Sequence, residues 1–201
     1  MCWGWTTKLP FGVSNWLTSL AGGRKTVPQT ALNRPTAGMS DYERDVVAKV
    51  RKYGWFQLRV VGDEKSPLSF SYTTGFWRTL GAPEILLFSL PEQTAHNVLW
   101  DVFRYLKSGQ RPQAGVPVSG IFGNANAVFL PVARRNYQTY MRTTRWFYGH
   151  EDFPCFQLFW PDRQGRFPWE AEFEVEFRKD QPDLTARGWS AEIPKPNSEL
   201  S

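Results

Sequence analysis

The clearest hydrophobic pattern in the chain is a pair of apolar segments separated by a glycine-containing stretch. In the first segment, residues 68–74, large apolar residues alternate with small hydroxyl residues, which is the period of a strand with one buried face. The second, residues 85–88, has no polar position and is typical of a central strand covered on both faces. The intervening stretch predicts a loop that presents Trp77, Arg78 and Glu84.

Three other segments have the apolar period of an amphipathic helix. The first follows Ser40, which forms a capping-box pattern with Glu43, and it ends at Gly54. The second covers residues 91–107. The third covers residues 134–148, with apolar residues on one face and arginines on the other.

Further strands complete an α+β pattern. They are predicted at residues 55–61, near 116–118, and at 127–132, 153–160 and 166–170, the last two forming a hairpin. The acidic alternation from Ala171 predicts an added edge strand. We therefore expect a mixed, largely antiparallel sheet of about five to seven strands with three helices packed on it.

The chain divides into three parts by composition. Residues 1–38 have no sustained period and are predicted to be a poorly ordered basic leader; a transit peptide or an upstream extension of the coding frame would also give this pattern. Residues 39–170 form a single α+β domain. Residues 171–201 are predicted to be the edge strand and a loose C-terminal tail.

Charge and cysteine content argue against a nucleic-acid-binding protein and against a disulfide-rich secreted protein. Four of the 24 basic residues and none of the 19 acidic residues lie in residues 1–38, so the body is nearly neutral. A high isoelectric point is then weak support for nucleic-acid binding. Two cysteines do not form a disulfide framework, which favours a reducing compartment. No apolar run reaches the roughly 18 residues of a membrane span.

Motifs for common catalytic and cofactor chemistry are missing from the sequence. There is no phosphate-binding glycine loop and no Gly-x-Ser-x-Gly elbow. His150, Glu151 and Asp152 could coordinate a metal, but a further ligand is not evident. The prediction is no cofactor and no metal.

An ordered set of short segments resembles a known family. The set begins with Tyr53-Gly54-Trp55 and Tyr72-Thr73-Thr74-Gly75-Phe76, continues with Pro83-Glu84-Ile85 and Ala95-His96, and ends with residues 157–162 and 165–170. Over about Ser40 to Glu170 the chain is similar to the bacterial family called domain of unknown function 4262. The resemblance implies a bacterial, cytosolic protein and a fold class but no activity. Ala82 stands where the resemblance leads us to expect a histidine.

Several residues are candidates for a ligand pocket at one edge of the sheet. Strand-end loops commonly carry ligand groups, and the two central strands and the predicted hairpin would meet there. The predicted pocket is bounded by Tyr72, Thr73, Glu84, His96 and Trp160, with Asp162 or Arg166 at its mouth and Trp169 in the same hairpin. Packing and turn formation would also explain each of these residues.

The leading hypothesis is a non-catalytic binding module for a protein partner or small ligand, and an immunity or regulatory role is one form of this hypothesis. Aromatic and arginine side chains, which are enriched in binding surfaces, are abundant. The alternative is a hydrolase or transferase in which Glu84 and His96 act as acid and base. A weaker alternative is nucleic-acid binding through the arginine face of the third helix, with Arg135, Arg142, Arg145 and Trp146.

Overall fold

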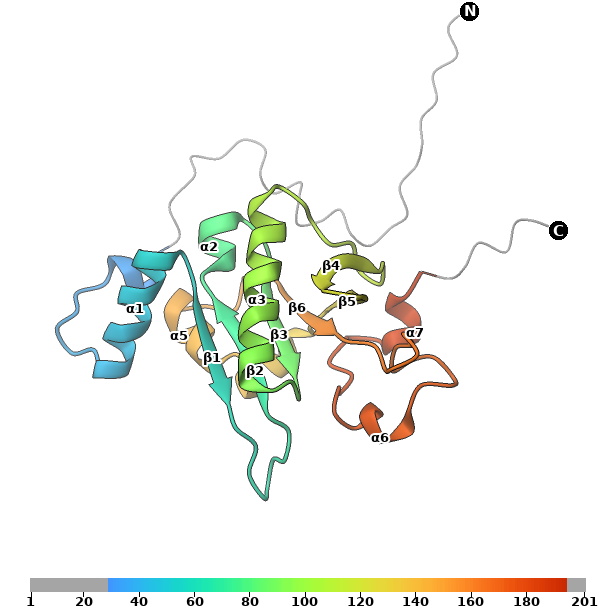
Figure 1. Ribbon diagram of the computed structural model, residues 1–201. Helices are drawn as coiled ribbons and strands as arrows, with labels where there is room; N and C mark the ends of the chain where they lie inside the picture. The colour runs from blue at the N-terminus through green and yellow to red at the C-terminus, as the bar shows by residue number, and fades with distance from the viewer. Residues whose placement is uncertain (1–28, 195–201) are drawn as a thin grey trace, which may run out of the picture.

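Six strands form one mixed sheet in the computed structural model, which describes residues 29–194 (Figure 1). The strands are β1 (Phe56–Val60), β2 (Phe70–Thr74), β3 (Glu84–Phe88), β4 (Val118–Phe122), β5 (Ala125–Pro131) and β6 (Cys155–Phe159). Their spatial order is β1-β2-β3-β6-β5-β4. Neighbours are antiparallel except β3 and β6, which are parallel. Two three-stranded meanders therefore meet along one parallel pair, and the predicted α+β class is confirmed.

The described residues contain seven α-helices rather than the three predicted. They are α1 (Asp41–Tyr53), α2 (Phe76–Leu80), α3 (Glu92–Lys107), α4 (Tyr137–Tyr140), α5 (Arg142–Tyr148), α6 (Val175–Arg178) and α7 (Trp189–Glu192), with 3-10 turns η2 (Ala31–Asn33) and η3 (Arg134–Asn136). None of the helices in this part of the chain is long and apolar enough to cross a bilayer.

The helices cover the two faces of the sheet separately. The apolar stripe of α3 and the start of α2 pack with Ile85, Leu87 and Leu158 on one face. On the other face α1, α4 and α5 pack with Tyr72 and Leu86. Figure 1 shows α3 and α5 on opposite sides of the sheet. The alternation of side chains along β3 explains why this strand is apolar throughout.

The first two predicted helices are confirmed in detail. Ser40 and Glu43 form the capping box of α1, and Gly54 ends the helix with φ +86°. In α3 the whole predicted stripe is buried: Ala95, Val98, Leu99, Val102, Phe103 and Leu106.

The third predicted helix is interrupted at Met141. Its backbone there has φ −120° and ψ +34°, outside the helical region. Met141 is fully buried, and the next amide but one, that of Thr143, donates to the hydroxyl of Tyr72 instead of continuing an unbroken helix. A tertiary hydrogen bond from the sheet thus overrides the local helical period.

The C-terminal part differs most from its prediction. No strand forms after β6 in the described chain; turns follow Asp162, and one helical turn, α6, replaces the predicted edge strand. Beyond Lys179 the segment is packed rather than loose, since Gln181, Leu184 and Thr185 are buried. The alternating acidic residues after Ala171 therefore lie in turns and in α6, and they do not form a strand.

The predicted leader overlaps the described structure only in residues 29–38. Ala31 in this stretch is fully buried in the core beside α1 and α5. Arg51 of α1 donates to the carbonyl of Leu32, which fixes the segment against the domain. Packing thus begins upstream of the predicted boundary at residue 39, while residues 1–28 lie outside the described range.

Candidate functional site

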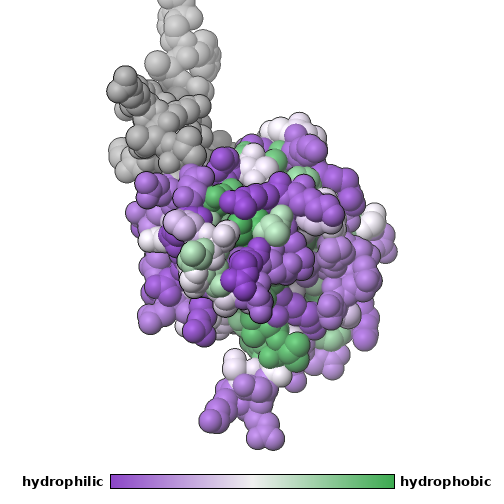
Figure 2. All heavy atoms as spheres, turned by 90° about the vertical axis from the view of Figure 1, so that its left-hand side faces the viewer, coloured by the Kyte–Doolittle hydropathy of each residue, from purple (hydrophilic) through white to green (hydrophobic). Residues whose placement is uncertain are grey.

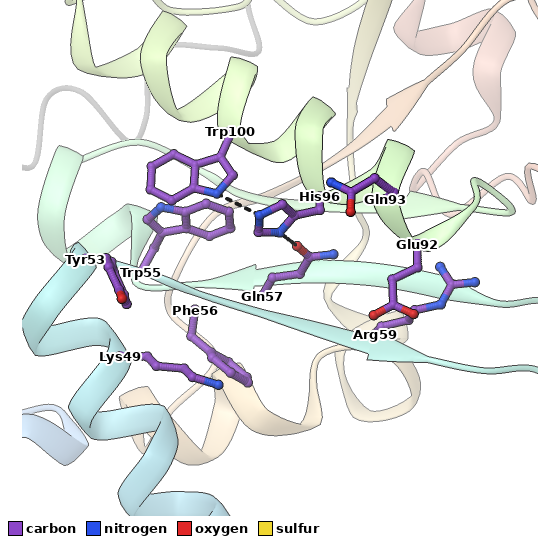
Figure 3. A pocket seen from close by; sticks show the side chains of 10 residues that line it. All are labelled: Lys49, Tyr53, Trp55, Phe56, Gln57, Arg59, Glu92, Gln93, His96 and Trp100. Atoms are coloured by element: carbon purple, nitrogen blue, oxygen red, sulfur yellow. Dashed lines mark hydrogen bonds between the residues drawn. The ribbon is translucent and has the colours of Figure 1, made fainter.

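A groove crosses the edge of the sheet where α1, β1 and α3 meet (Figure 3). Its volume is about 720 Å³, within the range of ligand pockets. The lining residues are Lys49, Tyr53, Trp55, Phe56, Gln57, Arg59, Glu92, Gln93, His96 and Trp100. Of the residues predicted to bound a pocket, only His96 lies here. We call this the edge groove.

The floor of the edge groove is the outer strand of the sheet. β1 pairs only with β2, and its backbone groups make no other hydrogen bond within residues 29–194. Alternate N–H and C=O groups of an edge strand point away from its partner. Side chains alternate as well, so Gln57 and Arg59 face α3 while Phe56 packs toward α1.

A hydrogen-bonded chain fixes His96 in the wall of the groove. The indole Nε1 of Trp100, which can only donate, donates to His96 Nε2 over 3.1 Å. The proton of the neutral ring is therefore on Nδ1, which donates to Gln57 Oε1 over 2.9 Å. Gln57 in turn donates to Ser71 over 3.4 Å. Both ring nitrogens are occupied, so His96 positions Gln57 and Trp100.

One buried donor beside the groove has no partner. Trp55 is 4% exposed, and its Nε1 makes no hydrogen bond to a described residue. Its ring packs edge-on against Trp100 and Phe76, with centroids 5.0 and 5.1 Å away. An unsatisfied buried N–H costs free energy unless another group accepts from it.

Charged side chains lie at the open side of the groove. Arg59 donates to the carbonyl of Leu90 over 3.0 Å, which leaves its other guanidinium nitrogens without a partner in the described chain. Glu92 lines the same groove and brings a carboxylate (Figure 3). Lys49 is paired with Asp45 over 2.8 Å and lies over the ring of Phe56.

Glu84 contacts α5 on the face of the sheet opposite α3, and it is completely buried. Its Oε1 accepts from the backbone N–H of Gly75 and of Trp77, over 2.9 and 3.1 Å, and from the hydroxyl of Tyr148. Its Oε2 accepts from Thr73 over 2.6 Å. These amides are the free N–H groups at the start of α2, so Glu84 caps that helix from the neighbouring strand.

The capping contacts explain why α2 forms where a loop was predicted. The N-cap residue is Gly75, with φ +116°. Glycine has no side chain that could accept a hydrogen bond from the first amides of the helix. Glu84 supplies this acceptor, and the Tyr148 hydroxyl accepts from the N–H of Arg78 over 3.1 Å. The short helix thus depends on groups from β3 and α5 that lie outside its local sequence.

Burial and hydrogen bonding act in opposite directions on the Glu84 carboxyl. Desolvation raises its pKa above the ordinary value, and the hydrogen bonds from Thr73, Tyr148 and the two backbone amides oppose that rise. Burial and the nearby carboxylate also raise the pKa of Tyr148 and of the Cys155 thiol. A protonated, buried thiol does not act as a nucleophile.

The proposed acid and base are thus separated by the sheet. Glu84 contacts α5 on one face, whereas His96 belongs to α3 on the other and has its own partners. Acid–base catalysis requires both groups within hydrogen-bonding reach of one substrate. The geometry does not bring Glu84 and His96 together.

Tyr72 and Thr73 also have internal partners. The hydroxyl of Tyr72 accepts from Thr143 over 3.1 Å, and desolvation raises the pKa of this buried phenol. Thr73 accepts from the amide of Ile85 over 2.9 Å while donating to Glu84. These contacts hold β2, β3 and α5 together, away from the edge groove.

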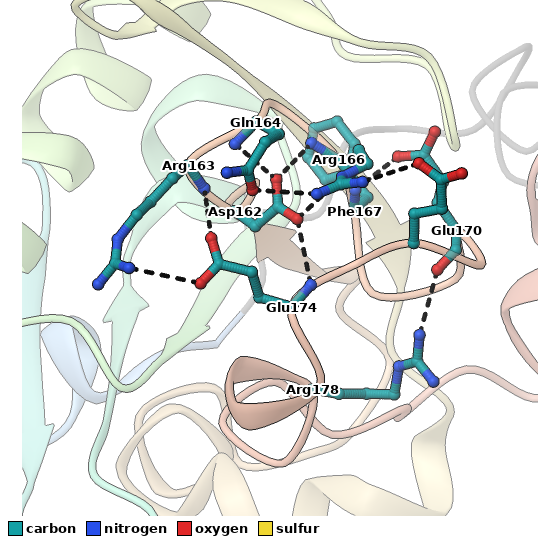
Figure 4. A network of polar contacts seen from close by, with 9 residues as sticks. Asp162, Arg163, Gln164, Arg166, Phe167, Glu170, Glu174 and Arg178 are labelled. Atoms are coloured by element: carbon teal, nitrogen blue, oxygen red, sulfur yellow. Dashed lines mark hydrogen bonds and ion pairs between the residues drawn. The ribbon is translucent and has the colours of Figure 1, made fainter.

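The last four predicted ligand residues, Trp160, Asp162, Arg166 and Trp169, follow β6, and none of them lines the edge groove. Asp162 and Arg166 belong to a network of polar contacts (Figure 4). Asp162 accepts from the amides of Gln164, Arg166 and Glu174, and from the Arg166 side chain over 3.2 Å. Desolvation of this carboxyl would raise its pKa, but those amides and Arg166 lower it below the ordinary value. Asp162 therefore organises the turns that follow β6.

The neighbouring tryptophans are fixed by the same region. Gln181 accepts from the amide of Trp160 and donates to its carbonyl, each over 2.9 Å, and Trp160 Nε1 donates to Phe88. Trp169 stacks on Phe167 with an interplanar angle of 4°. A cavity of about 840 Å³ lies beside Trp160 and Asp162, but Trp169 does not line it.

The arginines predicted for nucleic acid do not form one surface. Arg135 donates to the carbonyls of Thr185 and Ala186 and holds the C-terminal segment. Arg142, Arg145 and Trp146 instead line a cavity of about 410 Å³. The carboxylates that were considered as metal ligands form ion pairs instead: Glu151 pairs with Arg145, and Asp152 pairs with Arg134. Residues 29–194 contain no cluster of three metal-binding side chains.

The edge groove was largely missed by sequence reasoning, although two signals pointed to it. Gln57 and Arg59 are polar residues at alternate positions of a strand, which marks a face that is not core. His96 and Trp100 are spaced by four residues and so share one helical face. That β1 is an outer strand could not be read from its local pattern.

One of the comparisons with known proteins identifies a family. No curated protein and no solved structure is significantly similar to the chain. A family profile described as "Domain of unknown function (DUF4262)" matches residues 49–174, more than half of the chain. The matched region includes the whole sheet, every residue that lines the edge groove, and the Glu84 cap. The chain therefore belongs to the DUF4262 family of domains of unknown function.

Proposed function

We propose that the protein is a binding module that accepts an extended segment of a partner protein in the edge groove. The observation that carries this proposal is that an outer strand, with backbone groups unused by the rest of the described chain, forms the groove floor. An extended peptide satisfies such groups by adding a strand to the sheet. Backbone pairing gives affinity, and side-chain pockets give specificity.

The walls suggest which side chains the partner segment carries. Side chains of an added strand alternate between the two faces of the sheet. Those on the α3 side meet Gln57, Arg59 and Glu92, which favours polar or charged residues. Those on the α1 side meet Tyr53 and Phe56, which favours apolar residues. Alternating polar and apolar positions are therefore expected in the ligand.

Exposed apolar residues near the groove support the same surface. Tyr53 and Val61, which flank β1, are 47% and 71% exposed. Figure 2 shows this side of the molecule, where hydrophobic patches interrupt a mainly hydrophilic surface. Apolar patches with a polar rim are typical of interaction sites.

Selection from a phage-displayed library of random twelve-residue peptides tests the proposal. Enriched peptides should shift the amide NMR signals of β1 and the facing residues of α1 and α3, and should slow hydrogen exchange in β1. Arg59→Glu should weaken the selected peptides about tenfold or more, because a charged contact changes sign. Lys179→Glu makes the same charge change at an exposed position after α6 and should have little effect. Failure to enrich peptides, or enrichment of peptides that perturb another surface, contradicts the proposal.

A further inference from the structure

A smaller cavity lies between α5, the residues that follow it and the segment before α1, and three arginines line it. Its volume is about 410 Å³. The lining residues are Arg34, Arg142, Arg145, Trp146, Gly149, His150 and Glu151. We call this the arginine pocket. Three guanidinium groups face one carboxylate, which leaves two formal positive charges in excess.

Two of the arginines are held in place by the fold. Arg34, from the segment before α1, donates to the carbonyl of Trp146 over 3.2 Å. Its guanidinium packs so closely on Gly149 that a Cβ there would lie 2.3 Å from its Nη2 atom. Arg145 Nε lies 2.5 Å from Glu151 Oε1, an ion pair without the alignment of a hydrogen bond.

The third arginine is uncommitted. Arg142 is exposed and makes no hydrogen bond or ion pair to any residue in the described range. His150 adds a further donor, because its Nδ1 accepts from the amide of Asp152 over 3.0 Å. The proton of the neutral ring is therefore on Nε2, the nitrogen that has no partner in residues 29–194.

From this arrangement we infer that the arginine pocket binds a phosphate monoester group of a small molecule. Guanidinium groups match the oxygens of phosphate in a planar, two-pronged geometry, and two excess charges balance a dianion. The cavity is larger than a phosphate group, so part of the molecule that carries it also fits. This site shares no residue with the edge groove and does not depend on the function proposed there.

NMR titration of the full-length protein with inorganic phosphate and with phenyl phosphate, at constant ionic strength in sodium chloride, tests the inference. Both ligands should cause saturable shifts of the amide signals of Gly149 and His150 and of the arginine Nε–H signals. Arg142→Ala should weaken binding about tenfold or more, because it removes a charge-assisted contact. Arg142→Lys should retain part of the affinity, since the charge remains without the planar fork.

Matched controls separate this site from general charge effects. Arg163→Ala removes an exposed arginine that pairs with Glu174 and does not line the pocket, and it should leave both affinities unchanged. Shifts that do not saturate, or that persist unchanged in Arg142→Ala, overturn the inference. It is also overturned if an oligonucleotide without a terminal phosphate or a phosphoserine peptide binds this pocket while phenyl phosphate does not, which would assign the pocket to a macromolecule.

Discussion

At the scale of single residues, Glu84 shows how a plausible catalytic group can be structural. A carboxylate after a proline at a strand entrance is compatible with a general base. Its four donors, Thr73, Tyr148 and the amides of Gly75 and Trp77, assign it instead to the start of α2. The sequence shows the residue type but not which distant donors converge on it.

Replacing Glu84 should therefore lower the free energy of unfolding, and the loss should be larger when more of the four donors are left without an acceptor. Glu84→Ala leaves buried amides and hydroxyls unpaired and should cost about 3 kcal/mol or more. Glu84→Gln keeps one acceptor oxygen for Gly75, Trp77 and Tyr148 and should cost less than half as much. Urea unfolding of the two variants measures the difference. Equal losses would show that these hydrogen bonds do not determine the stability of the site.

The raised pKa of Glu84 predicts a particular dependence on pH. A carboxyl whose pKa is higher in the folded state contributes stability below its unfolded pKa, and this is lost as pH rises through the folded value. The advantage of the wild type over Glu84→Gln should thus shrink as the pH rises above the ordinary carboxyl pKa of 4.5. Other titrating groups are common to both proteins and cancel in urea midpoints measured side by side. An advantage that grows with pH would mean that hydrogen bonds outweigh desolvation.

At the scale of elements, sequence patterns succeeded where the period alone determines structure. The stripe of α3, the capping box of α1 and the apolar strand β3 are local patterns, and all appear as predicted. Two elements depend on remote contacts. α2 needs a cap from Glu84, and the break at Met141 follows from the bond between Thr143 and Tyr72. Neither contact has a local signature.

The junction between α1 and α2 gives a test at this scale. A Cβ on Gly75 would lie 2.7 Å from the carbonyl oxygen of Gly54, and φ is +116°. Gly75→Ala should therefore destabilise the protein by about 2 kcal/mol or more. Gly81→Ala is the matched control, because φ is +60° and nothing lies within 4 Å; about 1 kcal/mol is expected. Thermal or urea unfolding of both variants checks the order, and a smaller loss for Gly75→Ala would contradict it.

At the scale of the whole molecule, the positions at which the folded domain begins and ends were the hardest property to predict. The C-terminal segment has few apolar residues and reads as loose, yet its carbonyls receive side-chain donors from the body of the domain. Arg135 and Asn136 donate to Thr185 and Leu184, and Gln157 donates to Pro182. The candidate sites follow the same rule, since each lies where remote segments meet.

Arg135 and Arg142 were predicted to lie on one basic helical face, but their replacement should change stability by different amounts. Arg135 binds the carbonyls of Thr185 and Ala186, so Arg135→Ala should cost about 1–2 kcal/mol. Arg142 makes no such bond within residues 29–194, and Arg142→Ala should change stability by less than about 0.5 kcal/mol. Urea unfolding compares them directly. Similar effects would mean that the C-terminal segment is not fastened through Arg135.

The two meanders meet only along β3 and β6 in the sheet, so the polypeptide could be cut between them into two fragments. Each meander is continuous in sequence, and residues 108–117 between them contain no helix or strand. A chain cut after Pro112 would yield two fragments, each with one apolar strand, β3 or β6, left without its neighbour. Such edges promote aggregation unless they are paired. The fragments should be insoluble when expressed separately and should purify together when co-expressed, which would make this domain a split reporter.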